Sequence, residues 1–230
     1  TGLQTVTDRQ FPNNVRWQLH RRTEQGWEVA VTDHDHFTRE PCPLGYHAGR
    51  LWMSANPAIA LTSGRYGIPA QPQLLDSSAD DPAAGYTAHI PVWDSEFPFT
   101  EHTYRGMAVD GVHGEALLFH IHGHIAQHWA YRDRADAWAA NGQLVFPWSA
   151  EDNEALRLCY PNAALSSGQA LVMGVSDIVE PHKDWRAAKF EVTQREWDYV
   201  FRRLYYAWTP SIASTPFSDW IEIANQERFA

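Results

Sequence analysis

The sequence has few cysteines, a deficit of positive charge and no long apolar run. Two cysteines, Cys42 and Cys159, occur in 230 residues, which excludes a framework of several disulfides. They could form one bridge or remain two buried thiols. No apolar run approaches the ~20 residues that a membrane-spanning helix needs, so no membrane partner is expected. With 18 Lys and Arg against 28 Asp and Glu, the net charge is −10, which disfavours nucleic acid as a partner.

Several catalytic signatures are also absent. The sequence has no phosphate-binding loop, no Gly-x-Gly-x-x-Gly fingerprint and no Gly-x-Ser-x-Gly elbow. A glycosidase with paired carboxylates remains open, because a sequence does not give the distance between carboxyl groups. Asp94, Glu96 and Glu101 would supply such groups just before His102.

Aromatic residues are abundant, with eleven Trp, nine Tyr and ten Phe, and they suit β-sheets and stacking on sugar rings. Short runs typical of strands recur between turn signals, over residues 27–31, 50–54, 107–109, 116–122, 143–146, 163–165, 170–175 and 220–224. Residues 58–87 are rich in Pro, Gly, Ala, Ser and Asp and predict a long loop. One short helix is predicted from Thr193 to about Leu204, with Thr193 as its cap and Glu196 three residues later.

An internal repeat relates the predicted strands to one another. Tyr104-x-x-x-Ala-Val precedes Gly114-Glu-Ala-Leu-Leu-Phe, and Tyr160-x-x-x-Ala-Leu precedes Gly168-Gln-Ala-Leu-Val-Met. Gly49-Arg-Leu-Trp-Met repeats the second half of this pattern. The three glycines are roughly one four-stranded sheet apart, which is the spacing of β-propeller blades.

The repeat therefore predicts an all-β fold of propeller blades, each a four-stranded antiparallel sheet, with long loops and one short helix. A single domain is expected over residues 1–230, with blade-like units at 15–57, 100–148 and 156–225. Three or four such units make a partial propeller. A fragment of a larger chain and an unusual small β fold remain open alternatives.

A pair of histidines stands at the far ends of one predicted hairpin. His102 opens the first strand-like run and His124 follows the second, so an antiparallel hairpin brings the two imidazoles together. Histidine is the side chain best suited to proton transfer near neutral pH. The pair could form a catalytic site, a metal site or ordinary packing.

Alternating histidines also suggest a metal site. His120, His122 and His124 fall on one face of a continuous strand, and zinc takes tetrahedral nitrogen and sulfur ligands, so either cysteine could complete the set. Residues 33–36, Asp-His-Asp-His, form a second candidate cluster. We expect no cofactor to be required, and we keep a structural zinc or calcium ion as an alternative. A polar strand face explains both clusters without metal.

Together, these motifs resemble those of a known family. Asp133-x-x-x-x-Trp138 is similar to a degraded Asp-box. The run from His102 through Gly114-x-x-Leu-x-Phe to Gly123-His124, with Tyr160-Pro-Asn-Ala-Ala-Leu, resembles the BNR-repeat, sialidase-like β-propellers that include the ulvan lyases. The resemblance covers roughly residues 100–225 and, more weakly, 15–57.

The resemblance implies a uronate-directed polysaccharide lyase that cleaves by β-elimination. In such a reaction a base removes the proton at sugar C5, a cation neutralises the carboxylate, and an acid protonates the leaving oxygen. His102 and His124 correspond to the base and the carboxylate-contacting group, in unassigned order. Tyr160 corresponds to the acid.

One family residue is missing from the matching position. Where the family has an aromatic-Arg pair, this chain has Met173-Gly174, so Arg186, Arg202 and Arg203 become the candidates for binding the substrate carboxylate. The expected partner is an acidic polysaccharide or oligosaccharide. A sialidase-like glycoside hydrolase and a non-catalytic sugar-binding propeller are the alternative functions. The resemblance and the start at Thr1 favour a secreted or periplasmic protein.

Overall fold

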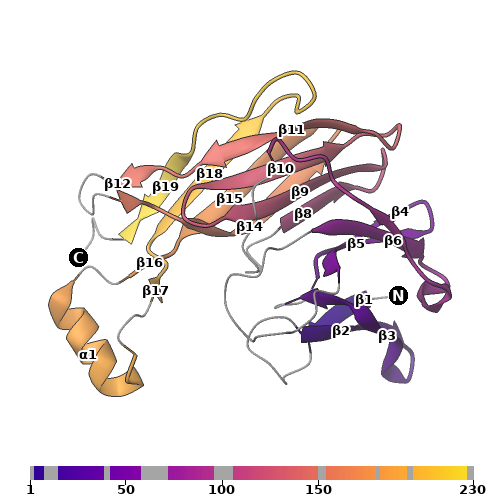
Figure 1. Cartoon of the computed structure of the whole chain (residues 1–230), viewed down its shortest axis with the longest axis horizontal. Coiled ribbons are helices and arrows are strands. Elements are labelled where there is room, and N and C mark those ends of the chain that lie inside the picture. Colours follow the sequence, from indigo (N-terminus) through magenta and orange to yellow (C-terminus); the bar gives the residue numbers. More distant parts are fainter. Residues whose placement is uncertain are drawn as a thin grey trace.

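The computed structural model describes residues 3–7, 15–38, 42–57, 72–95, 106–149, 154–179, 182–195 and 199–226. Strands dominate this part of the chain, which contains one α-helix, α1 (Lys183–Thr193), and one short 3-10 helix, η1 (Pro82–Ala84). The prediction of an all-β fold with one short helix is confirmed (Figure 1).

Three consecutive four-stranded antiparallel meanders form the body of the molecule, and we number them as blades in chain order. Blade 1 consists of β4 (Leu44–His47), β5 (Arg50–Pro57), β6 (Gln73–Ser78) and β7 (Thr87–His89). Blade 2 consists of β8 (Gly106–Asp110), β9 (Glu115–His122), β10 (Ala126–Arg132) and β11 (Trp138–Val145). Blade 3 consists of β14 (Leu158–Ser166), β15 (Gln169–Ser176), β18 (Arg203–Thr209) and β19 (Ile221–Asn225).

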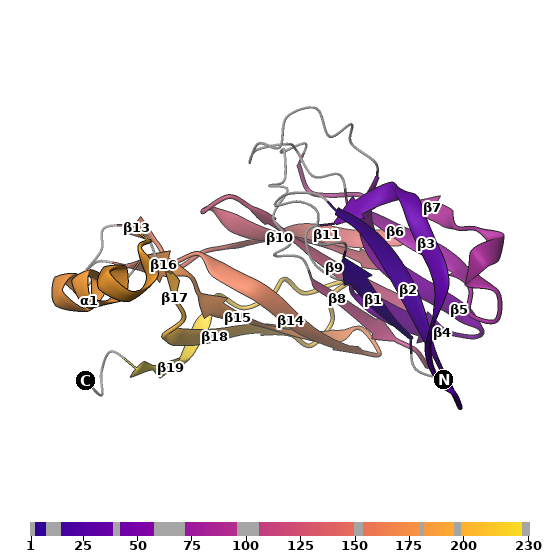
Figure 2. The same cartoon turned by 90° about the horizontal axis from the view of Figure 1, so that it is seen from below.

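An N-terminal sheet precedes the blades. It consists of β1 (Leu3–Thr7), β2 (Val15–Thr23) and β3 (Gly26–Thr38), and the end of β3 pairs with the end of β5. Two short ladders complete the described strands: β12 (Trp148–Ser149) with β13 (Glu154–Ala155), and β16 (Ile178–Val179) with β17 (Tyr199–Val200). The N-terminal sheet and α1 lie at opposite sides of the molecule (Figures 1 and 2).

Two predicted boundaries are wrong. The expected loop over residues 58–87 contains β6, whose Leu74 and Leu75 are fully buried, because two apolar side chains outweigh the polar composition around them. The expected unit over residues 15–57 stops too early, because β2 and β3 are hydrogen-bonded through β5 to blade 1, which continues into β6 and β7.

The predicted helix is also misplaced, because α1 ends where the prediction begins. Thr193 donates its hydroxyl to Lys189 O (2.9 Å), and Gln194 adopts a left-handed conformation (φ 56°) that terminates the helix. From Arg203 the chain forms β18, which pairs with β15 on one side and β19 on the other. Pairing with two neighbouring strands outweighs a local helical pattern.

The side chains of β9 pack alternately on its two faces, as expected for a strand that is buried on both faces. Leu117, Phe119 and Ile121 pack toward blade 3, whereas Ala116 and Leu118 pack toward blade 1 with Trp52. Blade 2 is therefore the central layer of the three blades.

The repeat glycines occupy equivalent turns, which we call the turn end of the blades. Gly49, Gly114 and Gly168 have φ values of 78°, 75° and 75°, a left-handed conformation that glycine adopts without steric cost. Each glycine precedes the second strand of its blade. The glycines of the sequence repeat thus mark the turn between the first and second strands of each blade.

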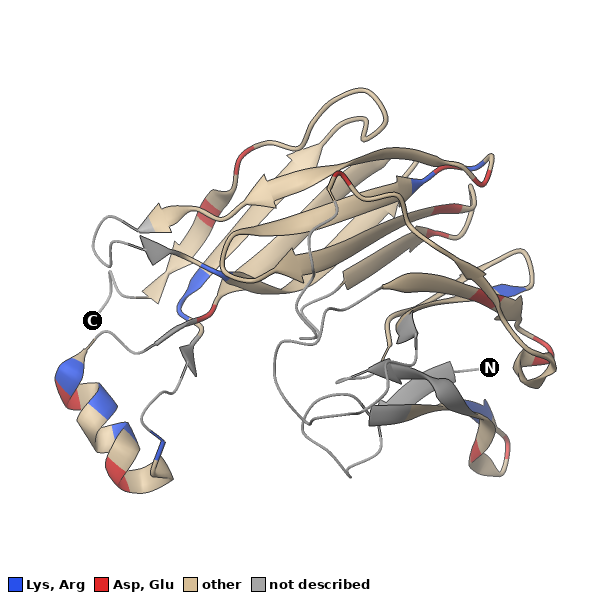
Figure 3. Ribbon diagram, in the orientation of Figure 1, with Lys and Arg blue, Asp and Glu red and all other residues tan. Residues whose placement is uncertain are grey.

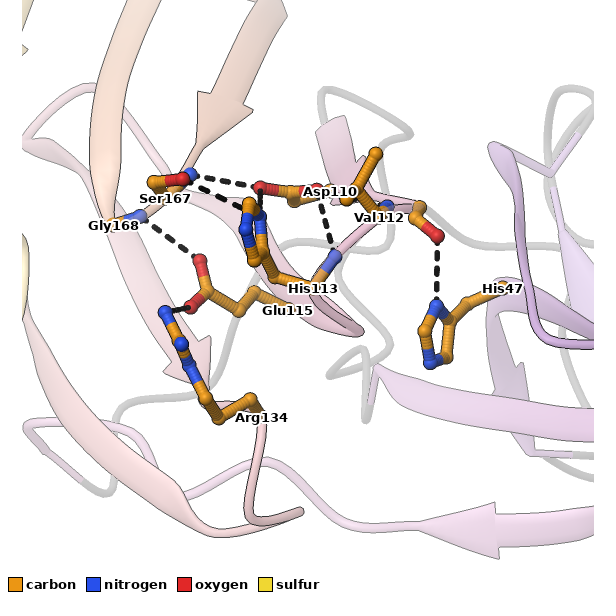
Figure 4. Close-up of polar contacts among 9 residues, drawn as sticks. His47, Asp110, Val112, His113, Glu115, Arg134, Ser167 and Gly168 are labelled. Atoms are coloured by element: carbon orange, nitrogen blue, oxygen red, sulfur yellow. Dashed lines mark hydrogen bonds and ion pairs between the residues drawn. The ribbon is translucent and has the colours of Figure 1, made fainter.

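Side chains tie the three turns together (Figure 4). His47 of blade 1 donates from Nδ1 to Gly111 O of blade 2 (2.8 Å). Asp110 of blade 2 accepts the Ser167 N–H of blade 3 (2.7 Å), and Glu115 accepts the Gly168 N–H (2.9 Å). Arg134 completes this arrangement with an ion pair to Glu115 (3.0 Å).

The innermost strands β8 and β14 approach closely where a glycine stands. A Cβ atom placed on Gly106 would lie 2.4 Å from the backbone oxygen of Pro161, which cannot move without displacing β14. We expect Gly106→Ala to lower the free energy of unfolding by about 1–3 kcal/mol, the usual cost of overpacking. Urea denaturation followed by tryptophan fluorescence measures it, and an unchanged midpoint would contradict this contact.

Candidate functional site at the loop end

The end of blades 2 and 3 opposite the turn end carries their longer connections, and we call it the loop end. There β8 and β14 begin and β9 and β15 end, so turn 123–125 and the described parts of segments 146–157 and 177–202 lie at the same end. The described candidate residues His124, Tyr160, Arg202 and Arg203 belong to these connections or to the adjoining strand ends.

An ion pair between Arg157 and Asp177 lies beneath this surface. The two side chains are 9% and 1% exposed, and Arg157 Nη2 donates to Asp177 Oδ2. The backbone supports the pair, since Asp177 N donates to Arg157 O (2.9 Å). Cys159 donates its thiol to the same carboxylate oxygen (3.1 Å). Burial raises the pKa of the Cys159 thiol well above its usual range, which keeps the thiol protonated as a donor.

Arg157 also connects this buried pair to the surface. Its Nη1 lies 3.4 Å from Nε2 of His124, which is exposed in the turn between β9 and β10. The contact spans two blades, because His124 belongs to blade 2 and Arg157 precedes the first strand of blade 3. Gln127 strengthens the same junction by donating to Leu158 O (3.0 Å).

Exposed aromatic side chains border the polar cluster. Tyr160 is 46% exposed at a bulge in β14, has φ 51°, and packs edge-on against Phe201 with ring centroids 5.7 Å apart. The Arg202 guanidinium lies over the ring of Trp185, 4.6 Å from its centroid, and the ring of His182 packs against the same Trp185 with centroids 4.5 Å apart. Stacking surfaces next to hydrogen-bonding groups are typical of saccharide sites.

The three arginines named from sequence differ in position. Arg203 is buried at the start of β18, Arg202 is half-buried on Trp185, and Arg186 is exposed on α1. Arg157 was missed, although a signal exists in the sequence. It stands between Leu156 and Leu158, both buried, and an arginine within a buried run requires a charged partner.

The missing arginine at Gly174 has a steric explanation. A Cβ atom there would lie 3.0 Å from Leu158 Cβ and 3.6 Å from the ring of Trp220. No long side chain fits without moving β14. His102, the first predicted catalytic residue, lies outside the described residues, so the structure does not place it relative to His124.

The three histidines predicted to share one strand face do not all lie on that strand. β9 ends at His122, and the turn that follows directs His124 to Arg157. His120 is fully buried opposite His128 in the β9–β10 register, and the rings of His122 and His128 lie 5.6 Å apart. Burial and the neighbouring His128 lower the pKa of His122, against an opposing effect of Asp94.

The metal prediction gains no support from this part of the chain. Within the residues that the structure describes, no group of three or more His, Cys, Asp or Glu side chains is arranged to hold a metal ion. Cys42 and Cys159 are not joined by a disulfide and belong to different core clusters. The side chains of residues 33–36 lie outside the description.

A serine, a histidine and an aspartate meet at the turn end but do not form a catalytic triad. Asp110 Oδ2 and Ser167 Oγ both contact Nδ1 of His113, at 2.7 and 3.3 Å. A proton relay needs the acid and the nucleophile on different ring nitrogens. The cluster in Figure 4 is therefore a structural one.

No helix within the described residues is long and apolar enough to cross a membrane. No protein-family model matches the sequence, and no curated protein matches it either.

Solved structures show which fold the chain shares. A GH43 endo-arabinanase from Bacillus licheniformis aligns with a TM-score of 0.50 and 12% identity, over 94% of this chain and 70% of that chain. An exo-β-1,3-galactanase from Clostridium thermocellum aligns with a TM-score of 0.52 and 13% identity, over 97% of this chain and 46% of that chain. The predicted β-propeller fold is confirmed, and this chain spans less than half the length of the galactanase.

Proposed function

We propose that this protein is a carbohydrate-active propeller of the glycoside hydrolase type, with its saccharide site at the loop end of blades 2 and 3. The contact from buried Arg157 to exposed His124, bordered by exposed Tyr160 and Phe201, carries the proposal. The propellers that share the fold include enzymes named as acting on arabinan and β-1,3-galactan, which favours hydrolysis over elimination.

The exposed groups of the site contact the saccharide in this proposal. The rings of Tyr160 and Phe201 stack on sugar faces, and His124 exchanges a hydrogen bond or a proton with a hydroxyl or a glycosidic oxygen. Arg157, Asp177 and Cys159 are too buried to touch a substrate. They are positioning residues that fix the turn carrying His124.

Hydrolysis of a glycosidic bond commonly uses two carboxyl groups placed on either side of it. Asp177 lies in the loop end but is engaged by Arg157 and Cys159. Asp94 is engaged by His128 at 2.6 Å. Glu96 and Glu101 lie outside the described residues; they are the other two carboxyl groups that the sequence places just before His102, and we propose them for the reaction.

A uronate-directed lyase is the second candidate, and one observation favours it. The family position at Gly174 lacks an arginine, but Arg157 places a guanidinium 3.4 Å from His124. From beneath the surface this cation would act on a substrate carboxylate only through its electrostatic field, while Arg202 would make the direct contact. The pairing of Arg157 with Asp177 offsets most of its charge, which makes hydrolysis the better-supported reaction.

Product chemistry tests the proposal. The protein is incubated with arabinan, β-1,3-galactan and ulvan while new reducing ends and absorbance near the ultraviolet edge are both recorded. Reducing ends without absorbance indicate hydrolysis, and a rise in absorbance indicates elimination and the second candidate. Saccharide binding without either product would overturn both enzymatic readings in favour of a sugar-binding propeller.

His124→Ala is expected to lower kcat/KM about 100-fold or more, because a positioned acid or base contributes that factor. His20→Ala is the matched control, since His20 lies on β2 in the N-terminal sheet. An equal loss in both variants, or full activity of folded His124→Ala, would remove His124 from the site.

A further inference from the structure

The contact between Arg157 and His124 also determines which nitrogen of the His124 ring carries hydrogen. Nη1 of Arg157 lies 3.4 Å from Nε2 of His124. A guanidinium has N–H donors and no acceptor, and it stays protonated at every pH at which proteins are folded. The hydrogen bond therefore runs from Arg157 to His124, and Nε2 of His124 accepts it with its lone pair.

An imidazole nitrogen that accepts a hydrogen bond carries no hydrogen, so the hydrogen of a neutral ring lies on the other nitrogen. For His124 this is the tautomer with hydrogen on Nδ1. The doubly protonated ring is disfavoured for the same reason, because its Nε2–H would face an N–H group of Arg157 with no acceptor between them. A second positive charge beside the guanidinium adds to this cost.

The surroundings of Arg157 hold its guanidinium in this orientation. In Figure 3 the middle of β14 and β15 is free of charged residues; Arg157 precedes β14 and Asp177 follows β15, so the pair stands where both strands meet the loop end. The Arg157 side chain is 9% exposed, and its Nη2 donates to Asp177 Oδ2. Cys159 donates to the same oxygen, and Asp177 N donates to Arg157 O. The guanidinium cannot turn away from His124 without breaking the ion pair.

The turn that carries His124 is fixed as well. Gly123 adopts a left-handed conformation (φ 51°), and Ile125 N donates to His122 O (3.0 Å), which closes the turn. Phe146 N donates to Ile125 O (2.9 Å) and ties the turn to the segment after β11. The imidazole and the guanidinium are thus carried by segments that backbone hydrogen bonds hold in place.

A neutral ring with hydrogen on Nδ1 has a restricted chemistry. Its Nδ1 can donate a hydrogen bond to a saccharide oxygen, but it has no lone pair with which to take up a proton. Its Nε2 has a lone pair, and Arg157 occupies that lone pair. Of the two exchanges open to His124 at the loop end, the hydrogen bond therefore remains and the transfer of a proton does not.

We propose that Arg157 is a positioning residue that holds His124 in the neutral tautomer with hydrogen on Nδ1, so that His124 serves the saccharide site as a hydrogen-bond donor. The donor role rests on the proposed function, whereas the tautomer does not. A donor aimed at an oxygen on which charge develops contributes about 100-fold or more to the rate, so the loss expected for His124→Ala is the same. Proton transfer then falls to the carboxyl groups proposed for the reaction.

NMR spectroscopy of the full chain with isotope-labelled histidine tests the tautomer, because couplings between ring hydrogens and ring nitrogens distinguish both neutral tautomers and the doubly protonated ring. His124→Gln identifies the His124 signals by their loss. Near neutral pH and without saccharide, we expect the wild type to show hydrogen on Nδ1 of His124, as in His47, whose Nδ1 donates to Gly111 O. Hydrogen on Nε2, or on both nitrogens, would overturn the proposal.

Two variants test the role of Arg157. Arg157→Met/Asp177→Leu removes the donor together with both charges, so the folded variant should show the tautomer with hydrogen on Nε2 of His124 in addition to the other. Arg134→Met is the matched control, because Arg134 pairs with Glu115 at the turn end and should leave the His124 signals unchanged. A double variant that circular dichroism shows to be folded and that keeps the wild-type pattern would overturn the role of Arg157. The wild-type spectrum decides the tautomer if the double variant does not fold.

Activity tests the donor role separately. On a saccharide that the wild type cleaves, the folded double variant should lower kcat/KM about 10-fold or more, because misplacing a catalytic group costs up to about 100-fold. Full activity of that variant would overturn the donor role. A wild type that cleaves none of the saccharides would contradict the proposed function, and the spectra recorded without saccharide would still decide the tautomer.

Discussion

Arg157→Met is expected to lower the free energy of unfolding by about 3–5 kcal/mol, since removing one partner of a buried ion pair leaves the other charge without compensation. Asp177 would retain the Cys159 thiol as a donor, which is a much weaker partner than a guanidinium. Urea denaturation monitored by circular dichroism measures the loss.

The double variant Arg157→Met/Asp177→Leu provides the control. Replacing both charges by apolar groups removes the uncompensated carboxylate, so much of the lost stability should return. A single variant as stable as the wild type, or a double variant less stable than the single one, would show that the pair does not stabilise this junction.

Asp110→Ala is expected to cost about 2–4 kcal/mol, because it removes the acceptor from several donors at once. The carboxylate accepts the N–H groups of Val112 (2.9 Å), His113 (3.0 Å) and Ser167 (2.7 Å), and the last bond joins two blades. Asp133→Ala is the matched control: Asp133 caps an exposed turn within blade 2 and should cost about 1 kcal/mol or less. Equal losses would contradict the special role of Asp110.

Acid should weaken the same contacts. Burial disfavours the Asp110 carboxylate, but hydrogen bonds from Ser167, His113 and Val112 outweigh it and hold its pKa well below the usual 3.8. The ionised Asp110 carboxylate therefore contributes its full stabilisation of the folded state above the pKa that Asp110 has in the unfolded chain. This contribution is lost as the pH falls below about 4. The wild type should lose more stability than Asp110→Asn between about pH 4 and pH 2.

The repeat was the most reliable feature that the sequence offered. Gly114 and Gly168 predicted equivalent turns because a left-handed conformation favours glycine, which adopts it without steric cost. Strand positions within blades 2 and 3 followed from the same repeat. Blade 1 was divided incorrectly because its turn at Gly49 lacks the upstream half of the pattern.

Other elements depended on distant partners that the sequence does not show. A local pattern after Thr193 predicted a helix, but β18 forms there because it pairs with β15 and β19. β6 was overlooked in a segment of loop-like composition. In both cases the deciding contacts come from strands that are remote in the chain.

The candidate site was predicted in part. His124 and Tyr160, both named from the sequence, lie at the loop end, while Arg157 was not considered. Its role depends on Asp177, twenty residues later, and on a turn of another blade. The spacing of residues in the sequence cannot show that His124, Arg157 and Asp177, which lie on different connections between strands, come together in the fold.

The bonds between the turns at one end of the blades bear on how the molecule opens in solution. His47 joins blade 1 to blade 2, and Asp110 and Glu115 join blade 2 to blade 3, so no blade can separate without breaking side-chain bonds to a neighbour. Amide protons of β5, β9 and β15 should then exchange with solvent through one shared opening event, whereas α1, which has no buried residue, frays by itself. We therefore expect the cooperative unit of unfolding to be larger than the structural repeat in this protein.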